Sequence, residues 1–405
     1  MKFNKLSQLF LVSAIGLSVA ALLTSCAINT IDYVFVADSA GSGSGSAGQI
    51  QTYDSDSGTG ALRIGQPTVP SGGNNPVSMA VSGDYSNLYV VNQGSNNVVH
   101  FAVAGNGVLT QKDVVTTSAT PVAVAVNTAE TYLYVVSGPG PSVLTTYALS
   151  SGTIGSAVDQ VTLSLAGVGY PDDTIVPTGV NVLTNNNAVY VTAYDQSAYN
   201  PGGTTTSSAN PGWVFGYTVG TGGALTATAN GPYKAGVKPV ALVSDPTNRF
   251  VYVTDFASNE LIGYTIQDSD DLVFLINGPF KTGNEPDAIT IDPRGLYLYV
   301  SNGLDSTVSG FVISLATGTP SAAVSATGTQ TNPTDTTPVA IVVDPSIGRF
   351  VYTANHEGND LSGFVLNPNT GALTGTQSAP YPSGSQPTAL AAVPHGNHAV
   401  QVVSP

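Results

Sequence analysis

One histidine and glutamate stand next to each other in the chain, within Asn355-His356-Glu357-Gly358-Asn359-Asp360, and no other His–Glu neighbours occur. A histidine or a carboxylate can act as a general base on water. His356 and Glu357 are therefore the candidate catalytic residues of a hydrolytic reaction. Adjacent side chains on an extended segment point in opposite directions, so a solvated loop histidine is the alternative interpretation.

A second set of polar residues shares one position of an internal repeat, where an apolar stretch ends. Its members are Asp38, Asn92, Asp255, Asn302 and Asn355. On a ring-shaped fold they would form a polar ring around one face, which could bind sugars or cations. The alternative is structural, because Asp and Asn side chains at such places often bond to nearby backbone N–H groups.

A long insertion is the third feature that could carry chemistry. Residues 194–212 lengthen one repeat and lead to the only tryptophan, Trp213. Extra loops on a repeat scaffold often carry recognition, so Tyr194, Tyr199 and Trp213 are candidate ligand-binding residues. They would act as a stacking platform for carbohydrate if all three were exposed.

Three signals mark the repeat, each occurring seven times, and the third of them is an aromatic residue that ends a further strand. A proline opens a short apolar stretch at Pro76, Pro121, Pro177, Pro239, Pro286, Pro338 and Pro387. An aromatic residue with β-branched neighbours marks a second stretch at Phe35, Tyr89, Tyr134, Tyr190, Tyr252, Tyr299 and Tyr352. Proline suits the first position of a strand, and turn residues such as Asp292-Pro293 separate the two stretches.

Each repeat therefore reads as an antiparallel meander, and a weaker fourth strand follows a Gly-rich turn in most repeats. Units of this size match the blades of a propeller. The predicted fold is all-β, a seven-bladed β-propeller of four-stranded antiparallel blades. The chain opens on a second-strand signal at Phe35 and ends with a first-strand signal at Pro387. N- and C-terminal strands are thus expected to share one blade and close the ring.

The N-terminus has the order of an export signal: Lys2 and Lys5, an apolar run, then Leu23-Thr24-Ser25-Cys26. That ending resembles the lipobox of bacterial lipoprotein precursors, which predicts lipidation of Cys26. The predicted organisation is a signal peptide over 1–25, a lipidated tether over 26–31 and the propeller over 32–405. The expected location is the cell envelope, anchored through Cys26, and the outer membrane if the host is Gram-negative, because Ala27 follows the cysteine.

Charge and composition exclude several classes of protein. The net charge of −15 makes nucleic acid an improbable partner. Cys26 is the only cysteine, so no internal disulfide can form. No metal site or cofactor is predicted. Arg249, Arg294 and Arg349 share one turn of the repeat, where structural Asp–Arg pairs are expected.

The motifs Tyr252-Val-Thr-Asp255 and Tyr299-Val-Ser-Asn302 resemble the YVTN repeats of the propeller-type lactonase family, which includes 6-phosphogluconolactonases. The resemblance extends over about residues 31–403. It implies a seven-bladed propeller, and for its enzymes a metal-independent lactonase, a carboxylic ester hydrolase. Those enzymes are similar to one another in an Asn-Arg-Gly-His-Asp-type stretch, and here His356 replaces the arginine.

A phosphorylated substrate needs fixed cations, and arginine is scarce in this chain. The function predicted first is therefore a lipid-anchored binding or scaffold module of the cell envelope. A lactone hydrolase is the alternative, and a polysaccharide-binding surface propeller is a second one. The expected partners are the membrane through Cys26 and an envelope protein, a glycan or a small lactone, with the chain itself monomeric.

Overall fold

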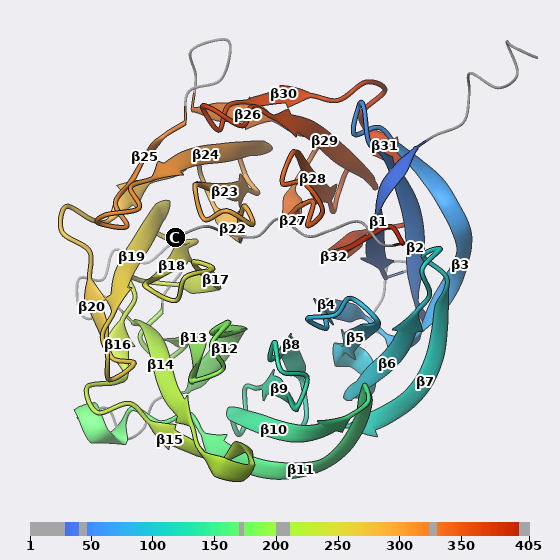
Figure 1. The fold of residues 1–405 in the computed structure, drawn as a ribbon. Coiled ribbons are helices and arrows are strands. Elements are labelled where there is room, and N and C mark those ends of the chain that lie inside the picture. The colour runs from blue at the N-terminus through green and yellow to red at the C-terminus, as the bar shows by residue number, and fades with distance from the viewer. Residues whose placement is uncertain (1–28, 40–46, 170–173, 200–210, 324–329, 397–405) are drawn as a thin grey trace, which may run out of the picture.

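The computed structural model describes residues 29–39, 47–169, 174–199, 211–323 and 330–396. Seven antiparallel sheets stand around a central channel, like blades of a propeller (Figure 1). The predicted fold class is confirmed. Cys26 lies outside the described residues. Among the described residues, no helix is long and apolar enough to cross a lipid bilayer.

The first three blades are four-stranded. In chain order, blade one holds β1 (Thr30–Asp38), β2 (Ala47–Asp56), β3 (Leu62–Asn74) and β32 (Pro387–Pro394). Blade two holds β4 (Pro76–Val81), β5 (Asn87–Asn92), β6 (Asn97–Val103) and β7 (Leu109–Thr116). Blade three holds β8 (Pro121–Val126), β9 (Tyr132–Ser137), β10 (Val143–Ser150) and β11 (Thr153–Thr162). Short 3₁₀ helices η2 (Gln93–Ser95) and η3 (Ala166–Val168) lie in connections.

The other four blades have five strands each. Blade four holds β12 (Ile175–Val182), β13 (Ala188–Asp195), β14 (Gly212–Val219), β15 (Leu225–Ala227) and β16 (Tyr233–Lys234), with η4 at Thr221–Gly223. Blade five holds β17 (Pro239–Ser244), β18 (Phe250–Asp255), β19 (Glu260–Ile266), β20 (Leu272–Phe274) and β21 (Phe280–Lys281). Blade six holds β22 (Pro286–Ile291), β23 (Tyr297–Asn302), β24 (Thr307–Ile313), β25 (Pro320–Ala322) and β26 (Thr331–Pro333). Blade seven holds β27 (Pro338–Val343), β28 (Phe350–Asn355), β29 (Asp360–Leu366), β30 (Leu373–Gly375) and β31 (Tyr381–Pro382).

The fifth strand departs from the four-stranded prediction. In blade five the outermost strand is split in two. β20 pairs with one end of β19, at Tyr264–Ile266, and β21 pairs with its other end, at Glu260–Leu261. Between them the chain turns through Gly278-Pro279, and proline supplies no N–H for a sheet ladder. The outer edge of these blades is therefore interrupted.

Blade one closes the ring as predicted. Its sheet order is β3-β2-β1-β32, so the C-terminal strand is innermost and pairs with the N-terminal strand β1. The pairing is antiparallel and joins Val34 to Ala392 and Val36 to Leu390. Sheet hydrogen bonds between the two ends of the chain thus hold the circle together.

The second strand of each blade forms the core. β5, β18, β23 and β28 are buried at every position because neighbouring blades cover both faces of the sheet. The aromatic residues of the repeat signal lie at their centres, with no exposed surface. The aromatic residues of the repeat therefore serve the packing between neighbouring blades.

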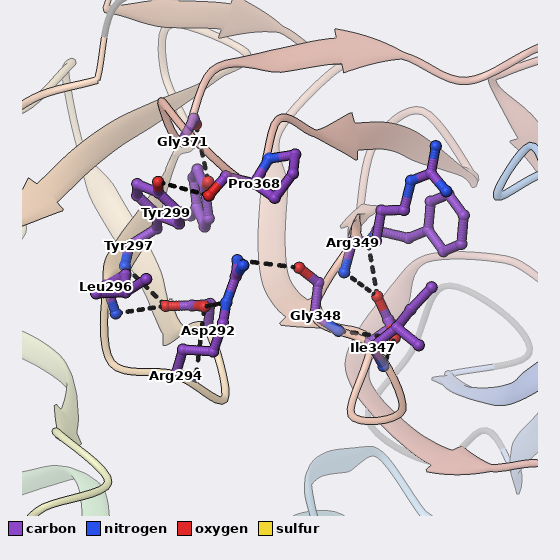
Figure 2. A network of polar contacts seen from close by, with 12 residues as sticks. Asp292, Arg294, Leu296, Tyr297, Tyr299, Ile347, Gly348, Arg349, Pro368 and Gly371 are labelled. Carbon is purple, nitrogen blue, oxygen red and sulfur yellow. Dashed lines mark hydrogen bonds and ion pairs between the residues drawn. The ribbon is translucent and has the colours of Figure 1, made fainter. Parts of the chain in front are cut away.

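Most of these tyrosines also bind the next blade through the hydroxyl group, which donates to a backbone carbonyl in that blade's outer turn. The pairs are Tyr89 with Gly152 (2.8 Å), Tyr190 with Asp270 (2.7 Å), Tyr252 with Gly318 (2.6 Å), Tyr299 with Gly371 (2.8 Å) and Tyr352 with Gly60 (2.8 Å). Figure 2 shows Tyr299 and Gly371. Tyr134 is equally buried, but its hydroxyl has no hydrogen-bond partner among the described residues.

The turn between the first and second strands is held by an aspartate. Asp292 accepts the backbone N–H groups of Leu296 and Tyr297, each at 2.7 Å (Figure 2). Arg294 pairs with Asp292 at 2.6 Å, as expected. The Arg249 guanidinium instead donates to Leu315 O of the next blade at 2.6 Å. These turns lie at the end of the first strand opposite to its proline.

The corresponding turn of blade seven meets blade one through two buried carboxyl groups. Asp344 accepts four backbone N–H groups of its own turn. Asp32 of β1 lies near it, and its Oδ1 accepts a hydrogen bond from the Ser346 hydroxyl. Burial, reinforced by the Asp344 charge, raises the pKa of Asp32 to about 8. Asp32 therefore keeps its proton at neutral pH.

The tyrosine contacts allow a matched test. Tyr252→Phe removes a hydroxyl and leaves Gly318 O without its donor, so we expect the free energy of unfolding to fall by about 1 kcal/mol. Tyr134→Phe removes a hydroxyl that has no partner, so we expect an unchanged or higher stability. Urea unfolding of the two variants measures the difference. Equal losses in both would contradict the interblade role of the hydroxyl.

The Asp32 pair gives a pH-dependent prediction. The unfolded chain loses this proton above about pH 4, whereas the folded chain retains it up to about pH 8, so the pair lowers stability as the pH rises between these values. Asp32→Asn keeps the shape of the side chain and cannot ionise. We expect it to raise the free energy of unfolding at pH 7 by an amount on the order of a few kcal/mol, and to have little effect near pH 4. Thermal unfolding from pH 4 to 9 tests this, and a gain independent of pH would contradict it.

Candidate functional site

The innermost strands β4, β8, β12, β17, β22, β27 and β32 stand around the centre of the ring (Figure 1). Their residues line a cavity of about 400 Å³. We call its opening at the proline ends of these strands the mouth. The residue after each first-strand proline faces this cavity. These residues are Val77, Val122, Thr178, Val240, Asp287, Val339 and Thr388. Among the described residues that line the cavity, Asp287 alone is charged.

Asp287 is half-buried at the start of β22. Burial raises the pKa of its carboxyl group to about 6, partly offset by the positive charge of Lys238 and increased by the negative charge of Glu285. Gly303 lies beside it, and a Cβ at that position would be 4.0 Å from Oδ2 of Asp287. A carboxylate with such a pKa is ionised at pH 7 and basic enough to accept a proton.

Lys238 is the residue directly before Pro239, where β17 of the neighbouring blade five begins. Its backbone N–H donates to Asp255 Oδ1 at 2.9 Å, which fixes the base of the side chain. Its Nζ lies 4.3 Å from the ring centroid of Phe256, 5.6 Å from that of Tyr199 and 5.9 Å from that of Tyr194. The ammonium group is therefore held by cation–π contacts next to Asp287.

His356 lies at the same mouth, after β28. Its backbone N–H donates to Thr337 O at 2.8 Å, and its Nδ1 is 3.1 Å from Pro387 O. A carbonyl oxygen only accepts, so Nδ1 carries the hydrogen and a neutral ring presents an unprotonated Nε2. Glu357 is exposed and makes no hydrogen bond with His356 among the described contacts. The structure does not bring these two predicted catalytic residues together.

The predicted polar ring is present but buried. Asp38, Asn92, Asp255, Asn302 and Asn355 are at most 1% exposed. Asp255 accepts the N–H of Val237 at 2.7 Å, and Asn302 accepts that of Gly283 at 3.1 Å. In this arrangement the side chains support the turns that carry the mouth residues. Ligand binding by these five residues stays a prediction.

The expected aromatic platform of Tyr194, Tyr199 and Trp213 does not form, which corrects the sequence interpretation. Trp213 is only 4% exposed, because it packs in the core against Ala193, and Lys234 Nζ lies 3.6 Å from its ring centroid. Tyr194 follows Ala193 in the strand and pairs with Gly212. Its side chain therefore faces the opposite side of the sheet from those of Ala193 and Trp213. Tyr194 and Tyr199 remain half-buried at the mouth, with ring centroids 5.2 Å apart.

The mouth also contains residues that the sequence interpretation missed, namely Asp287, Lys238, Glu285 and Phe256. One signal could have revealed Asp287. The position after the proline is valine or threonine in every other repeat, and only here is it charged. Among the described residues, no cluster of three or more His, Cys, Asp or Glu side chains is arranged to hold a metal ion.

The fold is a seven-bladed propeller, and Asp287 is the one charged side chain among the described residues that line its central cavity. The family model described as "Lactonase, 7-bladed beta-propeller" matches residues 33–174 and 107–402. The chain belongs to this family. No curated protein matches it in sequence.

Solved structures share the fold at low sequence identity. A candidate 6-phosphogluconolactonase from Bacteroides uniformis is 19% identical with a TM-score of 0.69, and the match covers 90% of this chain and 100% of that one. The periplasmic gluconolactonase of Pseudomonas aeruginosa is 18% identical with a TM-score of 0.71, covering 90% and 99%. A candidate 6-phosphogluconolactonase from Bacteroides fragilis is 20% identical with a TM-score of 0.67, covering 90% and 98%. At these identities the likeness shows the fold alone.

Proposed function

We propose that this chain is a metal-independent lactone hydrolase whose general base is Asp287. The observation that carries the proposal is the half-buried carboxyl group of Asp287, which is the one charged side chain among the described residues that line the cavity and whose pKa burial raises to about 6. Membership of the lactonase family and the lactonase names of three of its structural relatives support the reaction type.

The proposed reaction uses these side chains in order. The carboxylate of Asp287 takes a proton from a water molecule as the water oxygen bonds to the lactone carbonyl carbon. The Lys238 ammonium group stabilises the negative charge that develops on the carbonyl oxygen. The ring C–O bond then breaks, and the proton on Asp287 passes to the leaving ring oxygen. The product is the open hydroxy acid, and the base is regenerated.

His356 has a positioning role in this proposal. It sits on blade seven, next to blade six, which carries Asp287, and its unprotonated Nε2 can accept a hydrogen bond from a substrate hydroxyl group. Thr337, which binds the His356 N–H, is also close to Gly303, the neighbour of Asp287. The two side chains therefore border one opening from adjacent blades.

The main test is the rate of lactone hydrolysis, measured above the spontaneous rate. We expect Asp287→Asn to lower kcat roughly 10²- to 10⁴-fold, the usual contribution of a general base. In the unchanged protein, kcat/KM should rise with pH, be half-maximal near pH 6 and level off above it, because the base must be ionised. Asp287→Asn should abolish this profile.

The exposed Asp268, in the β19–β20 turn, gives a matched control, since Asp268→Asn changes the same charge away from the mouth. Full activity of Asp287→Asn would contradict the assigned base. If the unchanged protein hydrolyses no lactone, the binding or scaffold module becomes the favoured function instead.

We also propose that the protein is lipid-anchored in the cell envelope through Cys26. Support comes from the signal-like segment ending in Leu23-Thr24-Ser25-Cys26. On expression in a bacterial host, Cys26→Ser should lose incorporation of a labelled fatty acid and move from the membrane fraction to the soluble fraction. A labelled Cys26→Ser protein would refute lipidation at this residue.

A further inference from the structure

We propose that Tyr194, Tyr199 and Phe256 form an aromatic subsite around Lys238 that binds the ring of a neutral sugar lactone and selects it over a phosphorylated one. This rests on the proposed function, because it assigns a substrate class to the same mouth. The three rings come from blades four and five, on one side of the opening.

The aromatic residues are a departure from the repeat. In blades four and five the residue that pairs with the first-strand proline is followed directly by an aromatic residue. These aromatic residues are Tyr194 and Phe256. The equivalent residues in the other blades are small or polar: Ser39, Gln93, Gly138, Gly303 and His356. Packing between blades therefore does not require an aromatic residue here. The three rings are half-buried, which leaves part of each accessible.

The geometry suits a sugar ring. Tyr194 and Tyr199 meet edge to face at 69°, and the ring centroids of Tyr199 and Phe256 lie 5.6 Å and 4.3 Å from the same Lys238 nitrogen. Aromatic faces bind the C–H faces of a pyranose, while the ammonium group of Lys238 can donate to a carbonyl or hydroxyl oxygen. The aromatic rings and the ammonium group of Lys238 thus offer both contacts that a neutral lactone needs.

The charges at the mouth disfavour a phosphate group. The charges of Lys238 and Glu285 both act on the Asp287 carboxyl group, so this part of the mouth holds two carboxyl groups and one ammonium group. Several other cations are engaged elsewhere, among them Lys234, whose Nζ lies 3.6 Å from the Trp213 ring centroid. Arg249 and Arg294 occupy turns at the opposite ends of the first strands, and Lys281 pairs with Glu260 on the outer edge of blade five. A phosphate dianion would lack the paired cations that hold such groups and would meet two carboxylates.

The test compares D-glucono-δ-lactone with its 6-phosphate as substrates. We expect kcat/KM to be at least tenfold higher for the neutral lactone. Tyr199→Ala should raise KM for the neutral lactone about tenfold with kcat nearly unchanged, because it removes stacking but not the base. Phe274→Ala is the matched control, since Phe274 is 53% exposed on the outer edge of blade five, and it should change neither constant.

Calorimetric binding of the non-hydrolysable D-gluconolactam separates this proposal from the proposed function. Lactam binding that Tyr199→Ala weakens about tenfold, without turnover of either lactone, would support the subsite and remove the hydrolase. Turnover with an unchanged KM in Tyr199→Ala, or with equal or better use of the phosphorylated lactone, would overturn the subsite and leave the hydrolase standing. Neither binding nor turnover would overturn both.

Discussion

The structure depends on the contact between one blade and the next, above all the buried second-strand tyrosine whose hydroxyl binds a backbone carbonyl of the following blade. A single blade exposes two apolar faces, and its neighbours cover them. The tyrosine adds direction to this packing, because its hydroxyl reaches one particular turn. In Tyr352 the same contact runs from blade seven to Gly60 of blade one, so the ring closes with the interaction that builds it.

This dependence explains which parts of the molecule can vary. The second strands are buried and their exit residues hold turns, so they have little freedom to change for chemistry. Two positions of each blade face the mouth instead. One is the residue after the first-strand proline, and the other is the residue after the second-strand exit. Asp287 occupies one such position, and Tyr194, Phe256 and His356 occupy the other. A site can thus be made on this scaffold by a few substitutions, which is why the fold alone does not define an activity.

The sequence was sufficient for the fold because every repeat carries its own proline, aromatic and turn, and the closure follows from their order along the chain. It was not sufficient for the site. Asp38 and Asn302 looked like a ligand-binding ring because the sequence shows their shared position but not their burial. Trp213 looked like a surface aromatic at the end of an insertion, yet the ladder register places it in the core opposite Ala193. Asp287 was overlooked because it lies in a stretch that was interpreted only as a strand.

The closed ring also governs how the mouth residues work together. First strands of adjacent blades are neighbours around the channel, so Lys238 of blade five and Asp287 of blade six are close although 49 positions separate them in the chain. Their closeness has two opposite effects on Asp287. Burial weakens its tendency to ionise, while the lysine restores part of it, and the resulting pKa of about 6 lies just below neutral pH. A fully exposed carboxylate would be a weaker base, and one buried without the lysine would stay protonated to a higher pH. The blade-to-blade geometry is therefore what gives this carboxylate a useful basicity.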